Sequence, residues 1–321
     1  MQNLLDPAIL FFIFGVLAGT VKSNLEIPQP IARFLSLYLL MALGLKGGFA
    51  LAHSGFTAQV ATSLGCAILL ALVVPALGYQ VLKRFLSGYD AAAVAATYGS
   101  VSAVTFITAV QYMDRNGLAY GGHMAAAMAL MESPAIIMAV LFANTLRQQQ
   151  AAPGDRRALP VGKVLHESLT DGAQLLLLGS MVVGLLTGDV GKAAMQPFSG
   201  DLFKGMLAFF LLDMGLLAAR NLPQVRGKSP WLLAYAVLGP IIHAGIALAL
   251  AWLVGVPTGD ATLLMVLAAS ASYIAVPAVL RYAIPEANPS LYFGLSLGVT
   301  FPLNILLGIP AYAAVARAVL G

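Results

Sequence analysis

The chain consists mainly of long apolar stretches separated by short polar connections. An α-helix needs about 20 apolar residues to cross the hydrocarbon core of a membrane. The stretches are uniformly apolar and do not alternate with polar positions, which argues against a β-barrel. We therefore predict an all-α membrane protein with about ten transmembrane helices, at residues 8–25, 31–52, 57–82, 91–113, 119–146, 165–188, 202–219, 230–254, 261–282 and 290–319.

The composition supports this fold class. Of the 321 residues, 60% are hydrophobic and 9% are charged, against about 25% charged in ordinary soluble domains. So few charges cannot cover the surface of a soluble enzyme. Asp6 is the only charged residue before the first stretch, so we expect a retained helix and not a signal peptide.

An internal repeat is indicated by the middle of the chain and by residues that recur at a fixed spacing. The polar connection 148–163 separates residues 1–147 from residues 164–321, giving five predicted helices on each side. Related residues in the two halves lie 170 to 172 positions apart: Asp90 and Asp260, Ser100 and Ser270, Ser102 and Ser272, Asn116 and Asn288, Tyr120 and Tyr292. An odd number of helices turns the second copy upside down, as in many secondary transporters. We expect two inverted five-helix repeats.

Lys and Arg residues in the short loops predict the orientation. They are concentrated on the side that holds the central connection, which we therefore expect to face the cytoplasm. Both termini are then outside. The protein is predicted to be a multi-pass protein of the plasma (inner) membrane.

The fourth and ninth predicted helices carry the most informative polar residues. Each has a Ser-x-Ser sequence among small residues, at 100–102 and 270–272. Close helix packing is one explanation, since small residues let helices approach in lipid. Pro277 favours another, because proline breaks helices and such breaks at membrane depth line cavities. We predict that both helices are discontinuous and cross at mid-membrane, where half-helix N-termini suit a small anion.

Several motifs resemble those of one known family. These are residues 284–290 (Ile-Pro-Glu-Ala-Asn-Pro-Ser), 308–310, 44–48 and 99–105. In this combination, and over nearly the whole chain, the sequence is similar to the cyanobacterial sodium-dependent bicarbonate transporters.

The resemblance implies further properties. It implies a core domain beside a gate domain, a homotrimer, and sodium-coupled uptake of bicarbonate by movement of the core. It implies that the anion binds where the fourth and ninth helices cross, at Gly99, Ser100, Ser102, Thr105, Ser270, Ala271 and Ser272. The chain departs from the family pattern at Ala103 and Val104, and at Glu132, where the family has Asp.

Glu132 is the acid of most interest, because it lies inside the predicted fifth helix. Intramembrane carboxylates are costly and usually functional. Either it is a protonated acid with a structural hydrogen bond, or it binds the co-transported sodium ion with oxygen atoms of other residues. The predicted sodium ligands are Glu132, Ser102, Thr105, Ser272 and Asn304, and proton coupling stays open. Lys46 and Asp213 are also intramembrane, and we expect them to form an ion pair.

No catalytic function is indicated. The four His residues have no metal-ligand spacing, the single Cys excludes a disulfide framework, and no catalytic motif is present. The predicted function is sodium-coupled symport of bicarbonate. The alternatives are a sodium- or proton-coupled symporter of another small anion, such as a carboxylate, and an anion-sensing receptor or scaffold.

A cytoplasmic regulator is the last expectation, and it comes from the resemblance. Members of the family are commonly held by a small trimeric PII-like protein. Arg147, Arg156 and Arg157 in the central connection offer charge-assisted hydrogen bonds to such a partner, although the same arginines also set the topology.

Overall fold

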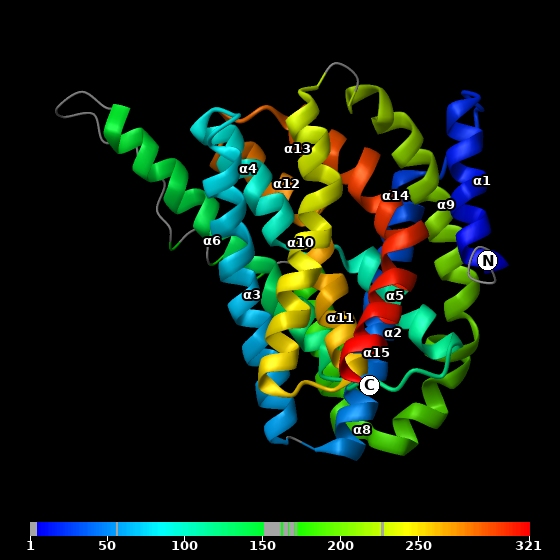
Figure 1. The fold of residues 1–321 in the computed structure, drawn as a ribbon. Coiled ribbons are helices and arrows are strands. Elements are labelled where there is room, and N and C mark those ends of the chain that lie inside the picture. The colour runs from blue at the N-terminus through cyan, green and yellow to red at the C-terminus, as the bar shows by residue number, and fades with distance from the viewer. Residues whose placement is uncertain are drawn as a thin grey trace.

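The computed structural model describes residues 5–55, 57–150, 162, 166, 170, 172–225 and 228–321. This part of the chain is a bundle of helices without β-strands (Figure 1). In the first half the helices are α1 (Pro7–Thr20), α2 (Gln29–Ser54), α3 (Ala58–Leu82), α4 (Gly88–Gly99), α5 (Ala103–Arg115) and α6 (Met124–Gln150). In the second half they are α8 (Gly172–Met195), α9 (Phe203–Asn221), α10 (Pro230–Val254), α11 (Thr258–Ala269), α12 (Ala275–Ala283), α13 (Pro289–Leu295), α14 (Phe301–Leu303) and α15 (Ile309–Leu320). Short helical turns at Gln196–Asp201, Leu222–Val225, Ser296–Thr300 and Asn304–Gly308 continue some of them.

The helices have the length and composition of a multi-pass membrane protein. Seven helical stretches of the described chain are long and apolar enough to cross a membrane, and the longest of these contains both α8 and α9. Two shorter apolar helices, α1 and α11, accompany them. The prediction of an all-α membrane fold is thus confirmed. The count of ten spans stays a prediction, although helix occupies most of the described part of every predicted span.

The fourth predicted helix is broken into α4 and α5, and the ninth into α11 and α12. Ser102 caps α5, because its hydroxyl accepts the backbone N–H of Thr105 at 3.2 Å. Ser272 has a related role before α12, where its hydroxyl accepts the N–H of Val276 at 3.3 Å. Pro277 lies in the first turn of α12, where a missing N–H costs nothing. Figure 1 shows α4 and α12 toward one end of the bundle and α5 and α11 toward the other.

Two helix pairs pack through glycine. Gly15 of α1 lies against Gly215 of α9, and Gly48 of α2 lies against Gly184 of α8. A Cβ atom on any of these four residues would collide with a backbone carbonyl of the facing helix. Small residues let backbones approach closely in a membrane, where dispersion contacts drive packing. Glycine therefore fixes both pairs.

Each half of the chain supplies an aspartate that binds the backbone of the other half. Asp90, near the start of α4, accepts the N–H of Asn288 at 2.8 Å. Asp260, near the start of α11, accepts the N–H of Gly121 at 2.6 Å. The two contacts join the first part of each broken helix to the connection that follows the other broken helix.

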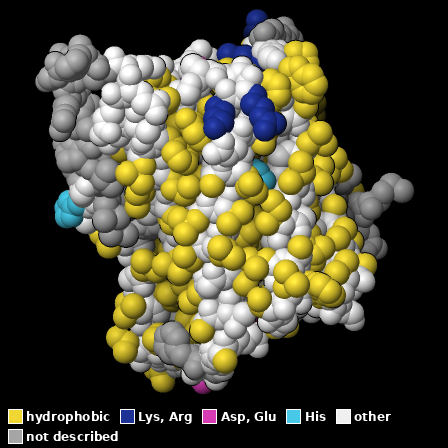
Figure 2. Space-filling model, turned by 60° about the vertical axis from the view of Figure 1, so that its left-hand side comes forward, with side chains coloured by type: hydrophobic (Ala, Val, Ile, Leu, Met, Phe, Trp, Pro, Cys, Tyr) yellow, Lys and Arg dark blue, Asp and Glu magenta, His cyan; other side chains and the backbone are white. Residues whose placement is uncertain are grey.

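The outer surface is mainly apolar. Figure 2 shows hydrophobic side chains over most of one face, with Lys and Arg side chains gathered near one end. Large exposed residues of α10 such as Trp231, Ile242 and Leu253 contribute to this surface. A lipid-facing exterior has this character.

Candidate functional site

The two helix breaks contact each other directly. The backbone N–H of Ser102 donates to the hydroxyl of Ser270 at 3.0 Å. In the other direction, the N–H of Ser272 donates to the carbonyl of Thr97 at 2.8 Å. Each break therefore satisfies a backbone donor of the other, as buried backbone requires.

A cavity of about 180 Å³ lies beside this contact, and we call it the serine cavity. Both half-helix N-termini reach it, α5 through residues 102–104 and α12 through residues 272–275. The rest of its lining comes from α2, α6 and α8. The lining residues are Ser36, Leu40, Val101, Ser102, Ala103, Val104, Glu132, Ser133, Ile136, Ala173, Ser272, Tyr273, Ile274, Ala275, Ala278 and Val279.

Three of the predicted site residues line the serine cavity: Ser102, Ser272 and Glu132. The hydroxyl groups of Ser102 and Ser272 also hold the first turns of α5 and α12, so any ligand that they bind is tied to the helix ends. The structure thus brings together the paired hydroxyls and the intramembrane acid.

The other predicted anion contacts are buried behind the cavity lining. Ser270 is bonded to the N–H of Ser102, and Thr105 donates its hydroxyl to that of Ser102 at 3.0 Å. The hydroxyl of Ser100 donates to the carbonyl of Glu132 at 3.1 Å. Gly99 packs against Pro75 with no room for a Cβ atom, and Ala271 is buried. These residues shape the breaks and position the groups that line the cavity.

Asn304, a predicted sodium ligand, is engaged elsewhere. Its side-chain amide donates to the carbonyl of Ala269 at 2.8 Å, and its carbonyl oxygen accepts the hydroxyl of Tyr312 at 3.0 Å. Asn304 is not among the residues that line the serine cavity. In this arrangement Asn304 caps the C-terminal end of α11 and so stabilises the break between α11 and α12.

The surroundings of Glu132 are polar although the residue lies inside α6. Ser133 lines the cavity next to it, and the side-chain amide of Gln174 in α8 donates to the carbonyl of Ala129 at 2.8 Å and to the Ser133 hydroxyl at 3.4 Å. In the described residues no group of three or more His, Cys, Asp or Glu side chains could hold a metal ion. One carboxylate with hydroxyl and carbonyl oxygens suits a weakly held monovalent cation better than a resident divalent metal.

Sequence reasoning missed three polar residues near this site: Ser36 of α2, Tyr273 between α11 and α12, and Gln174 of α8. Ser36 and Gln174 come from helices far from the Ser-x-Ser motifs in sequence, and neither carries a local signal. Tyr273 follows Ser272 directly, so its position was visible in the motif.

The arrangement has clear chemical consequences. The N–H groups in the first turn of a helix have no partner within the helix, and the helix dipole makes that end positive. Two such ends beside hydroxyl groups have the chemistry to attract a small anion without a fixed positive charge. Glu132 lines the same cavity, and its carboxylate has the chemistry to attract a cation.

Comparison with protein families agrees with this chemistry. The model of the Na+-dependent bicarbonate transporter superfamily matches residues 7–317. The chain belongs to this superfamily. No curated protein matches the chain. Membership in the bicarbonate transporter superfamily implies a small anion as substrate and sodium as the co-transported ion, and it indicates transport and not catalysis.

The expected ion pair between Lys46 and Asp213 is wrong. Lys46 Nζ lies 3.8 Å from Asp114 Oδ2 instead, and within the described residues no ion pair includes Asp213, which is buried in α9. Asp114 is at the C-terminal end of α5, and the packing of α5 against α2 brings it to Lys46. Distances along the sequence do not reveal such a contact.

Proposed function

We propose that this protein couples the entry of sodium to the uptake of bicarbonate, and that both ions bind in the serine cavity. One observation carries the proposal: the N-termini of α5 and α12, with the hydroxyls of Ser102 and Ser272, and the Glu132 carboxylate line the same cavity. An anion site and a cation site in one cavity allow each ion to favour the binding of the other.

Bicarbonate fits the anion site by its chemistry. It is a small planar oxyanion with one acidic hydroxyl, so it accepts hydrogen bonds from backbone N–H and serine hydroxyl groups and donates one in return. Hydroxyl and amide groups do not by themselves reject other planar oxyanions. A carboxylate substrate such as formate is therefore the alternative within the same class.

Sodium is proposed to bind at Glu132, with the hydroxyl oxygens of Ser102 and Ser272 as further ligands and with Thr105 behind them, where it donates to Ser102. Sodium is a hard cation and prefers oxygen ligands. Ser133, the next residue, also lines the cavity, and the Ser100 hydroxyl donates to the backbone carbonyl of Glu132, so the surroundings of this residue are polar. Asn304 then acts through the end of α11, since Ala269 and Tyr312 bind its side chain.

The proposed architecture is two inverted repeats, residues 1–147 and 164–321, joined by the cytoplasmic connection 148–163. Matched contacts support it: α1 packs on α9 and α2 on α8 through glycine, and Asp90 and Asp260 bind reciprocal backbone groups. The helices of the glycine pairs form the proposed gate domain, and the broken helices with α3, α6 and α10 form the proposed core. Both termini are proposed to lie outside the inner membrane.

A homotrimer and a PII-like cytoplasmic regulator complete the proposal. Arg156 and Arg157 lie outside the described residues, as does the connection 148–163 except 148–150 and 162. Arg147 is bound by Glu286, by the carbonyl of Ala283 and by Asn144. A regulator would therefore meet an arginine that is already paired, and we expect Arg156 and Arg157 to make the stronger contacts.

The experiment is uptake of labelled bicarbonate into proteoliposomes, with and without an inward sodium gradient. We expect saturable uptake that depends on sodium, and competition by excess unlabelled bicarbonate that is stronger than competition by formate or nitrate. If excess formate inhibits the uptake more strongly than excess unlabelled bicarbonate does, the protein is better assigned as a carboxylate symporter. Anion binding without flux would favour the receptor class.

A further inference from the structure

A second cavity, of about 370 Å³, lies along α2, α5 and α6, which also line the serine cavity. We call it the lysine cavity, after Lys46 in its wall. Its lining comes from α2, from α5, from the connection between α5 and α6, and from the start of α6. Lys46, Asp114 and Tyr120 are its polar side chains of interest.

The two cavities are lined by different residues of the same helices, with apolar side chains at neighbouring positions. On α2, Leu40 lines the serine cavity and Leu43, about one turn on, lines the lysine cavity. On α5, Val104 lines the serine cavity and Phe106 lines the lysine cavity.

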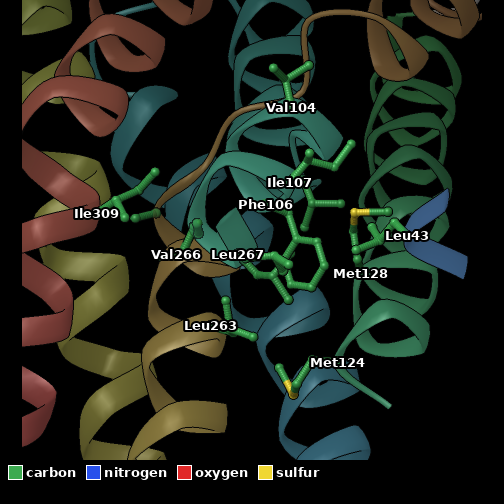
Figure 3. Close-up of a cluster of buried hydrophobic side chains, with 14 of the residues drawn as sticks. Leu43, Val104, Phe106, Ile107, Met124, Met128, Leu263, Val266, Leu267 and Ile309 are labelled. Carbon is green, nitrogen blue, oxygen red and sulfur yellow. The ribbon is translucent and has the colours of Figure 1, made fainter. Parts of the chain in front are cut away.

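Met128 of α6 belongs to the same buried cluster as Leu43 and Phe106. Figure 3 shows these three side chains close together. We call these three side chains the apolar septum.

The charges in the lysine cavity favour an anion. Lys46 Nζ is 3.8 Å from Asp114 Oδ2, which is long for a charge-assisted hydrogen bond. Tyr120 donates its hydroxyl to the other oxygen of Asp114 at 2.8 Å. Lys204 lies close enough to Lys46 for the two positive charges to repel each other. Because Tyr120 already bonds the carboxylate of Asp114 and the contact of Lys46 with it is long, the ammonium group of Lys46 keeps N–H donors for an anion.

Both charged side chains are accessible from the cavity. The side chain of Lys46 is 29% exposed and that of Asp114 is 38% exposed. An ammonium group has three N–H donors, so Lys46 can bind an oxyanion and keep its contact with Asp114. A cation at this position would face Lys46 at close range, which makes a second sodium site here unfavourable.

We propose that the lysine cavity is a second binding site for the small oxyanion, with Lys46 as its main ligand and the septum of Leu43, Phe106 and Met128 as the barrier to the serine cavity. The proposal rests on the proposed function, because it takes the transported anion as the ligand. In this arrangement Lys46 concentrates the anion in the lysine cavity, on the other side of the septum from the serine cavity.

The test uses a single cysteine as a local probe of charge. Cys66 is the only cysteine of the chain and is buried, so Cys66→Ala with Ala119→Cys places one reactive thiol in the lysine cavity, where Ala119 is exposed. The rates of modification by a negatively and a positively charged methanethiosulfonate reagent are compared in the purified protein. The ratio of the two rates reports the local potential and needs no transport.

We expect the negative reagent to be favoured, and Lys46→Gln to lower the rate ratio by about tenfold, in the range of electrostatic focusing in clefts. Lys46→Arg keeps the charge and should keep the ratio. Lys192→Gln, which removes an exposed lysine that does not line the cavity, is the matched control and should leave it unchanged. If Lys46→Gln does not fold, Asp114→Asn tests the same field, since it should raise the ratio.

Bicarbonate should slow the modification of the introduced thiol by the negative reagent when Lys46 is present but not in Lys46→Gln. The second site would be overturned by a rate ratio that is the same in the parent, Lys46→Gln and Asp114→Asn. It would also be overturned if bicarbonate slowed the modification equally with Lys46 and with Lys46→Gln. Failure of the proposed function would be seen in a different experiment, as the absence of bicarbonate uptake by the parent protein, which has Lys46 and Ala119 intact.

Discussion

The backbone N–H of Ser102 donates a hydrogen bond of 3.0 Å to the hydroxyl of Ser270. This bond joins the break between α4 and α5 to the break between α11 and α12. The hydroxyl of Ser270 in turn donates to the carbonyl of Leu267, at 2.8 Å, in the last turn of α11. Neither break can change its backbone without breaking a buried hydrogen bond of the other, so the two breaks act as one unit.

Replacement of Ser270 by Ala should therefore destabilise the protein. It leaves the N–H of Ser102 buried without an acceptor, at a cost of about 1–3 kcal/mol. Thermal unfolding of the detergent-solubilised protein measures the loss. Ser296→Ala is the matched control, because Ser296 is equally buried but bonds only carbonyls of its own helical segment. Equal unfolding temperatures for Ser270→Ala and Ser296→Ala would argue against the structural unit.

The glycine contact between α1 and α9 gives a second prediction. Gly215→Ala forces a Cβ atom against the backbone of Phe12 and Val16, and overpacking of this kind costs about 1–3 kcal/mol. Gly205→Ala, on the same helix, meets no atom within 4 Å. It should be neutral or slightly stabilising, because alanine is the better helix former. The comparison is again made by thermal unfolding, and a larger loss for Gly205→Ala would refute close packing at Gly215.

The ion pair between Arg147 and Glu286 predicts a dependence on pH. The Arg147 guanidinium donates to both carboxylate oxygens, at 2.8 and 2.7 Å, and holds the pKa of Glu286 below its usual value of 4.5. A lowered pKa in the folded state stabilises the protein above the unfolded-state pKa, and this contribution disappears as the pH falls through the folded-state pKa.

Glu286→Gln should therefore be less stable than the parent at pH 7, by no more than about 1 kcal/mol because the pair is partly exposed. The difference should shrink as the pH falls below 4.5. Glu26→Gln, which removes an exposed carboxylate outside every ion pair of the described residues, controls for charge alone. A stability difference for Glu286→Gln that grows on acidification would contradict the assignment.

The sequence predicted the helix breaks because their signal is local. The Ser-x-Ser pairs recur at a fixed spacing, and Ser102 and Ser272 hold the first turns of the helices that follow. Pro277 indicated the second break correctly but does not sit in it, since it lies in the first turn of α12. Proline is favoured in the first turn of a helix, so it marks the segment after a break.

Contacts between distant helices could not be predicted in the same way. The periodicity of α2 does not say that Lys46 meets Asp114 and not Asp213, because the choice depends on how α5 packs against α2. Asn304 was predicted to bind sodium, but its amide binds the carbonyl of Ala269 at the end of α11. The polar neighbours Ser36 and Gln174 were missed for the same reason.

The anion site predicts the behaviour of two serine variants. Ser102→Ala and Ser272→Ala each remove a hydroxyl from the serine cavity. Loss of a hydrogen bond to a charged group costs about 1.5–3 kcal/mol, so the apparent affinity for bicarbonate should fall about tenfold to a hundredfold. Thr108→Val, farther along α5 and outside the serine cavity, should keep the parental affinity. Normal affinity in both serine variants would remove these residues from the anion site.

The coupling role of Glu132 gives the last prediction. Glu132→Gln preserves the size of the side chain and removes its charge, so a sodium ligand is weakened while the anion site keeps its hydroxyl groups. Bicarbonate uptake by this variant should lose its stimulation by sodium. Glu286→Gln, which changes a carboxylate outside the serine cavity lining, should retain it.

The most direct measurement of coupling is the entry of labelled sodium into proteoliposomes that is driven only by an inward bicarbonate gradient. Coupled binding is reciprocal, so each ion should drive the other. We predict that sodium accumulates above equilibrium in vesicles with the parent protein and does not do so with Glu132→Gln. Bicarbonate entry at the same rate with and without sodium, together with no sodium accumulation in the parent vesicles, would contradict symport through the serine cavity.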